Sequence, residues 1–400
     1  MARDGSAESS TVPGNHGERK QGSSMGRLVC VLNHHVWLMF MITGTLLAIS
    51  HVGRRSGYSW HFFTTGTKYL FSASGLQLYH VHPELQIGPL AFLVASPFIL
   101  LLPSKVGEVL AMGVMMALAF VLLGEIQKLG ARHLPTRRTL FLIIGLAVLV
   151  MWTEMSVRFG HLDDAFAIVF SVSALRTAKN GRWLWTAILL AAAVDFKPWA
   201  VAFLPILILL PSRRWLPALV LVVVGVAIVW GPFLVAAPSS IAAGSFTIPN
   251  APDSALRALG ISNARTPTWC RPTQILLGAL LALLLIARQR WAGVILMVIA
   301  VRVLLDPATK VYYDAGLVAG TAVVDLVMAA GVIPWSTTAV TLLIYLPGYV
   351  LPTADTLRGD LRALCLVGLI LTLPFLPRNA AMAWLDTPAR ELAERPVPEF

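Results

Sequence analysis

Charged residues are scarce in this 400-residue chain: Asp, Glu, Lys and Arg together make up only 13% of it. Hydrophobic residues make up 57%, and the mean hydropathy is +0.74. A water-soluble domain cannot bury so large an apolar fraction, so the composition excludes that class of protein. It predicts a polytopic membrane protein instead.

Cysteine is also scarce, with three residues in the chain. Cys30 and Cys365 lie in apolar runs and only Cys270 lies in a loop, which excludes a disulfide framework and a cysteine-based metal site. The formal net charge is +11, but the cations are scattered among loops without interleaved aromatic residues. We therefore expect no nucleic-acid partner, and we expect the membrane surface and anionic lipid groups as partners.

Apolar runs recur along the whole chain, and a membrane-spanning helix needs roughly 20 apolar residues. The alternating pattern of a β-barrel is not seen, so the runs predict an all-α bundle of about twelve spans. The runs are 29–50, 106–124, 140–156, 163–177, 183–196, 198–211, 215–236, 273–287, 291–306, 314–331, 337–351 and 362–377. A further run, 87–103, is broken by Pro89 and Pro97 and is predicted to lie flat or to re-enter.

Short basic loops predict the orientation, because Lys and Arg concentrate on the cytoplasmic side. Residues 128–139, 176–182, 212–214 and 288–290 are the clearest cytoplasmic candidates. This arrangement predicts a multi-pass protein of the bacterial plasma membrane. Its transmembrane domain is 28–377, its cytoplasmic tails are 1–27 (disordered) and 378–400, and its long outer loops are 51–86 and 237–272.

The stretch GHLDDAFA (160–167) places Asp163 and Asp164 at a predicted membrane boundary. A charge at bilayer depth costs roughly 2.5 to 3.5 kcal/mol and normally marks a water-filled, functional cavity. The same predicted outer end carries Lys197 in a hairpin and Arg302 near another turn. We predict that these acids and bases meet in one polar cavity.

Each of these residues also has a purely structural interpretation. The aspartates could cap the helix that begins there. Arg302 could pair with Asp306 one turn away. Lys197 could be an interfacial anchor.

His161 and the tyrosines near Arg302 also have alternative interpretations. His161 beside the aspartates suggests a divalent cation, but no second histidine lies at ligand spacing, so we predict no metal and no cofactor. Tyr312 and Tyr313 could belong to an interfacial aromatic belt.

Carboxylates and cations in a cavity at the membrane boundary suit a reaction on a lipid-linked phosphate. Lys197 and Arg302 could stabilise a departing polyprenyl phosphate. A carboxylate within hydrogen-bond reach could accept the proton of the attacking hydroxyl.

Four stretches resemble the GT-C membrane glycosyltransferases, particularly bacterial polyprenyl-phosphate-mannose-dependent mannosyltransferases. They are WHFFTTGTKYLF with LYHVHPELQIGPLAFLVASPFILLLP (60–71 and 78–103), FGHLDDAFAIVF (159–170), AAAVDFKPWAVAFLPILILLP (191–211) and RVLLDPATKVYYDAGL (302–317). The resemblance implies interfacial helices in the first outer loop. It also implies inverting transfer of a sugar, mannose in this family, from a polyprenyl phosphate to a lipid or glycan acceptor of the cell envelope.

The chain departs from that family at Ser59, where such enzymes usually carry an acid, and its first loop has no acid before Glu84. Asp163, Asp164 and Glu84 are therefore the candidates for the catalytic base. The candidates for substrate contacts are His82, Gln86, His161 and Tyr313. Two alternatives stay open: a transporter of lipids or small anions, and a non-catalytic scaffold subunit that has lost transfer activity.

Overall fold

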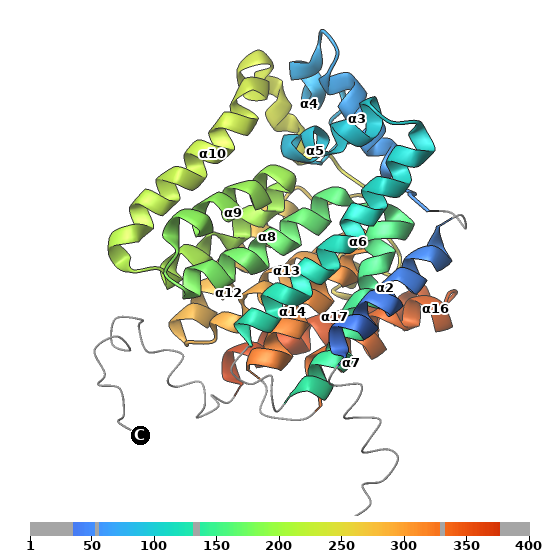
Figure 1. Ribbon diagram of the computed structural model, residues 1–400, viewed down its shortest axis with the longest axis vertical. Helices are drawn as coiled ribbons and strands as arrows, with labels where there is room; N and C mark the ends of the chain where they lie inside the picture. The colour runs from blue at the N-terminus through green and yellow to red at the C-terminus, as the bar shows by residue number, and fades with distance from the viewer. Residues whose placement is uncertain (1–34, 53–55, 131–136, 329–332, 377–400) are drawn as a thin grey trace, which may run out of the picture.

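The computed structural model of the chain describes residues 35–52, 56–130, 137–328 and 333–376 (Figure 1). These residues form helices and connecting segments, and an isolated antiparallel bridge joins Pro249 to Arg265. The predicted all-α class is therefore confirmed for this part of the chain. The predicted tails 1–27 and 378–400, the start of the first predicted span and most of the basic loop 128–139 lie outside the described residues.

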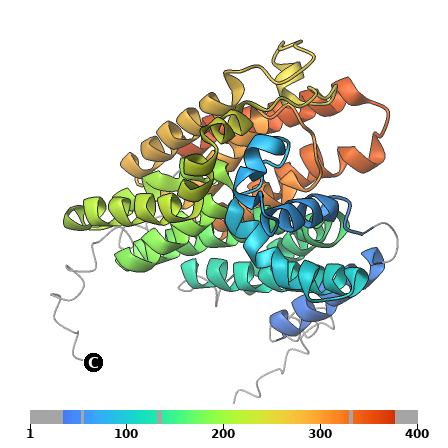
Figure 2. The ribbon, with the colours of Figure 1, turned by 90° about the horizontal axis from the view of Figure 1, so that it is seen from above.

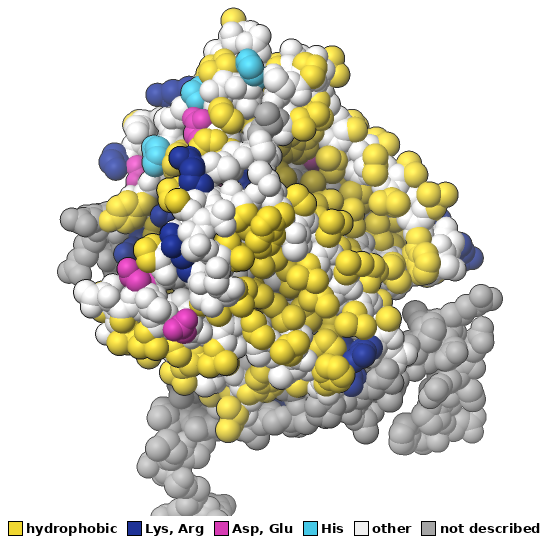
Figure 3. Space-filling view, turned by 180° about the vertical axis from the view of Figure 1, so that it is seen from behind, with side chains coloured by type: hydrophobic (Ala, Val, Ile, Leu, Met, Phe, Trp, Pro, Cys, Tyr) yellow, Lys and Arg dark blue, Asp and Glu magenta, His cyan; other side chains and the backbone are white. Residues whose placement is uncertain are grey.

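Among the described residues, four helices are long and apolar enough to cross a membrane, and their length and composition indicate an integral membrane protein. They are α6 (Ser104–Leu129), α7 with its π-helical extension (Arg138–Phe159), α10 with a short 3₁₀ turn before it (Ser212–Ala236), and α12 (Cys270–Ala287). Figure 3 shows hydrophobic side chains covering much of one face of the molecule, with most of the visible charged groups toward its margins.

The prediction of about twelve spans is wrong, because most of the other apolar runs form helices too short to cross a bilayer. Helix α9 (Trp183–Phe196) has 14 residues and α13 (Val294–Leu304) has 11. At 1.5 Å per residue these helices are only ~21 and ~16 Å long, against a hydrocarbon core of ~30 Å. Every residue of α13 is buried inside the protein. Its apolar run thus fills the protein core rather than facing lipid.

The apolar run broken by two prolines forms α5 (Pro89–Leu100), a helix of 12 residues that is also too short to span. Pro89 is the first residue of the helix, and an N–H at that position would make no intrahelical hydrogen bond, so proline is tolerated there. The helix packs against α3 (Trp60–Leu70) and α6. The hydroxyl of Thr67 in α3 donates to the carbonyl of Phe92 in α5 at 3.3 Å.

The remaining elements complete the fold around these helices. They are α2 (Val36–His51), η1 (Gly75–Gln77), α4 (Leu78–Val81), the π-helical η3 (Glu154–Phe159), α8 (Leu162–Lys179), η4 (Pro198–Leu209), η5 (Ser212–Arg214), η6 (Pro238–Ser245), α11 (Ala255–Ala258), η7 (Trp291–Gly293), α14 (Tyr313–Val327), α15 (Trp335–Val340), the π-helical η8 (Thr341–Tyr345), α16 (Pro347–Val350), α17 (Asp355–Thr372) and η9 (Leu373–Phe375).

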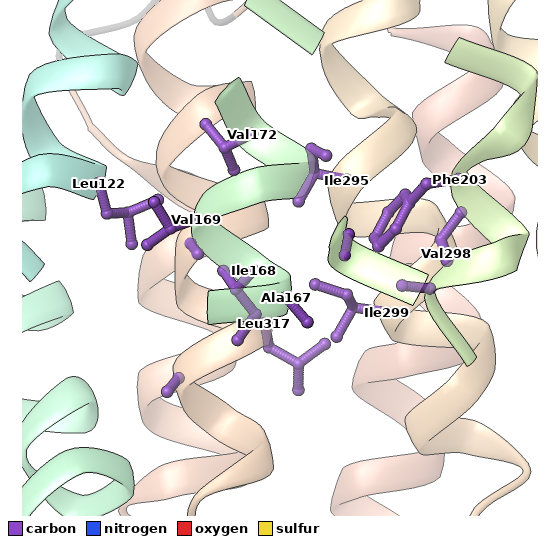
Figure 4. Packing of buried hydrophobic residues seen from close by; sticks show 14 of the residues in the cluster. Leu122, Ala167, Ile168, Val169, Val172, Phe203, Ile295, Val298, Ile299 and Leu317 are labelled. Carbon is purple, nitrogen blue, oxygen red and sulfur yellow. The ribbon is translucent and has the colours of Figure 1, made fainter. Parts of the chain in front are cut away.

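Helix α8 lies at the centre of the molecule, beside α6 and α9 in both ribbon views (Figures 1 and 2). Its side chains pack against α6, α13, α14 and η4, and Figure 4 shows this packing close up. The residues labelled there are Leu122, Ala167, Ile168, Val169, Val172, Phe203, Ile295, Val298, Ile299 and Leu317. Because apolar neighbours surround α8, its first turn is held in a fixed position.

The two long loop segments, residues 56–88 and 237–272, contact each other at one end of the molecule. Ser239 Oγ lies 2.8 Å from His80 Nδ1. Tyr79 also stacks on Trp230 of α10, just before the second segment, with 4.9 Å between ring centroids. Gln86 Nε2 donates to the carbonyls of Ala243 and Phe246 at 3.3 and 3.4 Å. The first loop segment therefore holds the second in place.

Gly88 joins the first loop segment to the turn after α9. Its N–H donates to the carbonyl of Phe196 at 2.9 Å, and a Cβ at this position would lie 1.9 Å from the carbonyl oxygen of Asp195. Backbone cannot give way as a flexible side chain can. We therefore expect Gly88→Ala to lower the melting temperature in detergent by several degrees, since roughly 1 to 3 kcal/mol of overpacking is expected.

Gly113→Ala is the matched control, because a Cβ at Gly113 meets no atom within 4 Å. Alanine there should leave the melting temperature unchanged or raise it, since alanine favours helix more than glycine does. Equal melting temperatures for Gly88→Ala and the unmodified protein would contradict the close contact at Gly88.

Candidate functional site

Asp163 and Asp164 lie in the first turn of α8, and their exposed fractions are 0% and 3%. The chain enters this helix from the π-helical segment Glu154–Phe159 through Gly160, whose φ of +72° is a left-handed conformation that favours glycine. The N-cap residue is His161, and no side chain caps the helix. The aspartates are therefore not caps, and their carboxylates face the neighbouring elements.

Lys197 reaches both aspartates from the turn between α9 and η4. Its ammonium contacts Asp163 Oδ2 closely and lies 3.2 Å from Asp164 Oδ2. Burial alone would lower the pKa of Lys197, but the adjacent Asp163 and Asp164 carboxylates outweigh it and raise that pKa. Lys197 therefore stays charged, and it is bound to carboxylates rather than being only an interfacial anchor.

Arg302, near the end of α13, approaches the same aspartates from another side. Its Nη1 lies 3.8 Å from Asp164 Oδ1. The guanidinium lies between the rings of Trp199 and Tyr313, 4.4 and 4.6 Å from their centroids. Such stacking fixes the plane of the guanidinium while its N–H groups remain directed to the sides.

The alternative partner of Arg302 in the sequence, Asp306, is bonded elsewhere. Asp306 Oδ1 accepts the N–H of Ala308 at 2.9 Å, and the described residues contain no ion pair between Asp306 and Arg302 within 4.0 Å. Burial raises the pKa of Asp306, and the positive charge of Arg302 opposes part of that rise. Arg302 thus belongs to the aspartate cluster rather than to a local helix pair.

His161 completes the cluster. Its Nδ1 lies 3.4 Å from Asp163 Oδ1 and 3.5 Å from Asp164 Oδ2. Its ring stacks on Tyr312, with 3.7 Å between centroids and 26° between planes. Neither ring nitrogen of His161 has a hydrogen-bond partner among the described residues.

His161, Asp163 and Asp164 have ligand atoms within 4.8 Å of one another and could hold a metal ion by geometry. The charges argue against it. Lys197 and Arg302 already offset the two carboxylates, so a divalent cation would add two uncompensated positive charges in a buried place.

We therefore expect a chelator to leave the protein unchanged. The melting temperature of the purified protein should be the same within a degree with EDTA and after addition of Mg²⁺, Mn²⁺ or Zn²⁺. A fall of several degrees with EDTA that one of these ions reverses would show that the cluster is a metal site.

A small cavity lies against the cluster, with a volume of about 10 Å³. It is lined by Asp164, Arg302, Trp199, Tyr312, Tyr313 and the apolar residues between them. This volume accommodates about one water molecule. Asp164 Oδ1 and Trp199 Nε1 have no hydrogen-bond partner among the described residues, although both are buried. Unpaired buried polar groups in a native protein call for a water or a ligand.

The structure does not bring the other sequence candidates into this cluster. Glu84 pairs with His82 at 3.0 Å in a partly exposed position, and Gln86 binds the carbonyls of the second loop segment. All three lie in the stretch before Gly88, and it is the backbone of Gly88 that bonds to Phe196, next to the turn that carries Lys197. Tyr313 does belong to the cluster, as a stacking partner of Arg302 rather than as a surface belt residue.

Ser59 lies close to the segment that leads into the cluster. Its N–H donates to the carbonyl of Phe159 at 2.8 Å, and the N–H of Gly57 donates to Val157 at 3.1 Å. Ser59 itself is buried, with 9% of its surface exposed. The position at which the resembling enzymes carry an acid is therefore two residues from His161 in this pairing.

Trp199 and Tyr312 are site residues that the sequence did not single out. Trp199 follows Lys197 and Pro198 in a run that looks purely apolar, and its contact with Arg302 depends on how η4 packs against α13. Tyr312 stood out only as half of a tyrosine pair. The nearby signal was the density of aromatic residues directly after charged ones, at 197–199 and 310–313.

Comparison with known proteins identifies no relative: no family model, no curated protein and no solved structure matches the chain. The function must therefore be inferred from the geometry and chemistry of the cluster itself.

Proposed function

We propose that the chain is a membrane glycosyltransferase of GT-C type. In this proposal it moves a sugar, mannose in the first instance, from a polyprenyl phosphate to a lipid or glycan acceptor at the outer face of the bacterial plasma membrane. The observation that carries the proposal is the convergence of Asp163, Asp164, Lys197 and Arg302 from three separate elements in one buried cluster.

The two cations suit the phosphate of the donor. Arg302 lies 3.8 Å from Asp164, which is longer than a hydrogen bond, so its N–H groups can turn to a phosphate without breaking a strong contact. Trp199 and Tyr313 hold its plane in the meantime. As the sugar leaves, negative charge grows on the phosphate, and fixed cations in a buried site stabilise that charge strongly.

Asp164 suits the role of base better than Asp163 does. Asp164 lines the small cavity and makes only the longer contact with Lys197, at 3.2 Å, whereas Asp163 does not line the cavity and binds Lys197 closely. In the transfer, the acceptor oxygen bonds to C1 of the sugar while the bond from C1 to the phosphate oxygen breaks. Asp164 takes the acceptor proton, and attack opposite the leaving phosphate inverts C1. Asp163 acts as the positioning residue for Lys197.

The donor can enter only if side chains move, because the cavity at the cluster has room for about one water. Tyr312 and Trp199 line that cavity and are the groups whose rotation would enlarge it. The polyprenyl tail can approach from the side, since hydrophobic side chains cover much of the face of the molecule in Figure 3.

A second candidate is a non-catalytic membrane subunit that keeps the fold of such an enzyme. The size of the cavity and the mutual neutralisation of the charges favour it, and so does the serine at position 59. A carrier of lipids or small anions would need a path between both membrane faces, and the small cavity at the cluster, with room for about one water, does not form one.

Transfer of label decides between these candidates. Proteoliposomes with the purified chain would be incubated with radiolabelled polyprenyl-phosphate mannose, or the arabinose analogue, and with lipid extract as acceptor. The enzyme proposal expects label in the acceptor fraction that depends on the protein. Label that stays on the donor with every acceptor tested would contradict transfer activity, and label that only changes membrane face would indicate a carrier.

A further inference from the structure

A second and larger cavity, of about 230 Å³, lies in the second loop segment between residues 244–247 and residues 266–272. The transfer mechanism above does not use it. It is smaller than the ~300–1,000 Å³ of pockets for drug-sized ligands, so it suits a group of about one sugar ring.

The walls of this cavity are bonded to each other, so it exists without a ligand. Arg271 Nη1 donates to the carbonyl of Gly244 at 3.1 Å, and Arg265 Nε donates to Thr247 Oγ1 at 2.9 Å. The Thr266 N–H donates to the Ile248 carbonyl at 3.0 Å. Gln86 from the first loop segment binds the carbonyl of Phe246. Both loop segments therefore support its shape.

Arg271 lines the cavity from the first turn of α12, and α12 packs against α13, the helix that carries Arg302. Gln274, three residues further along the same helix, donates to the carbonyl of Leu305 at 2.8 Å. This bond fixes α12 against the segment that follows Arg302, so the separation between cavity and cluster is set by the fold.

The lining chemistry fits a neutral, hydroxylated ring. The hydroxyls of Thr247 and Thr268 and the remaining N–H groups of Arg271 can hydrogen-bond to a ligand, while Phe246, Pro267 and Pro272 offer flat apolar surfaces. Arg271 is the one cation that lines the cavity among the described residues. A phosphate group would normally be met by more positive charge, so a sugar fits better than a phosphate.

We propose that this cavity binds the terminal sugar of a glycan acceptor and presents one of its hydroxyls toward Asp164. The proposal rests on the proposed transferase function. It also gives a role to Gln86, which the sequence predicted to contact sugar: Gln86 donates a hydrogen bond to the carbonyl of Phe246 and so supports a wall of the cavity.

The test measures binding rather than turnover. Saturation-transfer NMR on the full chain in detergent would use methyl α-D-mannopyranoside, methyl α-D-arabinofuranoside and methyl α-D-glucopyranoside as probes, with inorganic phosphate as competitor. The blocking variant is Gly244→Trp, because a Cβ at Gly244 meets no atom within 4 Å and the ring can enter the cavity. Thr268→Trp, from the opposite exposed wall, is a second blocker.

Gly348→Trp is the matched control, since Gly348 in α16 is equally unobstructed and lies away from the cavity. We expect at least one methyl glycoside to bind, at least tenfold weaker binding in both blocking variants, and unchanged binding in the control. Binding of none of the glycosides, equal binding by the blocked variants, or displacement of the sugar by phosphate would overturn the proposal.

Binding of decaprenyl phosphate, measured in parallel, separates this proposal from the proposed function. Gly244→Trp should leave it unchanged, and Lys197→Ala should weaken it. Sugar binding that is lost only in the blocking variants would support the sugar site. If the protein then bound no decaprenyl phosphate, the proposed polyprenyl-phosphate donor would be refuted. The reverse pattern would support the donor and refute the sugar site.

Discussion

Asp164→Asn is expected to lower the rate of sugar transfer about 10²- to 10⁴-fold, the usual contribution of a general base. Asparagine keeps the shape of the side chain but cannot accept the proton of the acceptor hydroxyl. Donor binding should change much less, because Lys197 and Arg302 remain. Initial rates of label transfer, measured at saturating donor, would report this loss in turnover rather than in affinity.

Two control variants separate the loss of a base from the loss of any acidic residue. Glu125→Gln removes another buried carboxylate, in α6, which binds Lys128 of the same helix and Arg176 near the far end of α8. Glu84→Gln removes the loop acid, which is 40% exposed and pairs with His82. Both should keep transfer rates within a few-fold of the unmodified protein. Full activity in Asp164→Asn, or a comparable loss in Glu84→Gln, would show that Asp164 is not the base.

Lys197→Ala is expected to destabilise the protein by roughly 3 to 5 kcal/mol, because it leaves the fully buried Asp163 without its partner. The same variant should abolish donor binding. Thermal unfolding in detergent measures the first effect, and retention of radiolabelled decaprenyl phosphate measures the second.

The double variant Lys197→Ala with Asp163→Asn distinguishes structure from function. Removal of both charges should restore much of the lost stability, since no uncompensated charge remains. Transfer should stay lost, because the donor phosphate still lacks its lysine. If the double variant recovered transfer along with stability, Lys197 would be a structural residue only.

Part of this site could be predicted from the sequence, because an unpaired charge in apolar surroundings is energetically costly. The four charged residues of the cluster each interrupt or border an apolar run: Asp163, Asp164, Lys197 and Arg302. A charge buried in such surroundings is stable only when it is paired with an opposite charge. The capping and local-pair alternatives failed for a reason that only tertiary structure reveals. His161 occupies the N-cap, and Asp306 bonds to the turn at Ala308.

The number of spans could not be read in the same way, because an apolar run shows only that a segment avoids water. The residues of α13 and α14 are buried against other parts of the protein. Most residues of α10 are not buried inside the protein, and its apolar surface suits contact with lipid. Stacking of Trp199 and Tyr313 on Arg302 was equally out of reach, since it depends on the packing of η4 and α14 against α13. Glu84 was misplaced because loop length does not tell which loop residue contacts the turn after α9.

The most direct test of donor binding at the cluster is the structure of the protein in lipid nanodiscs with a non-transferable polyprenyl-phosphate sugar analogue. We expect the phosphate within hydrogen-bond distance of Lys197 Nζ and the Arg302 guanidinium, C1 of the sugar facing Asp164, and the rings of Tyr312 or Trp199 rotated to admit it. A phosphate bound away from both cations, with Lys197 still bridging the two aspartates as it does here, would contradict it.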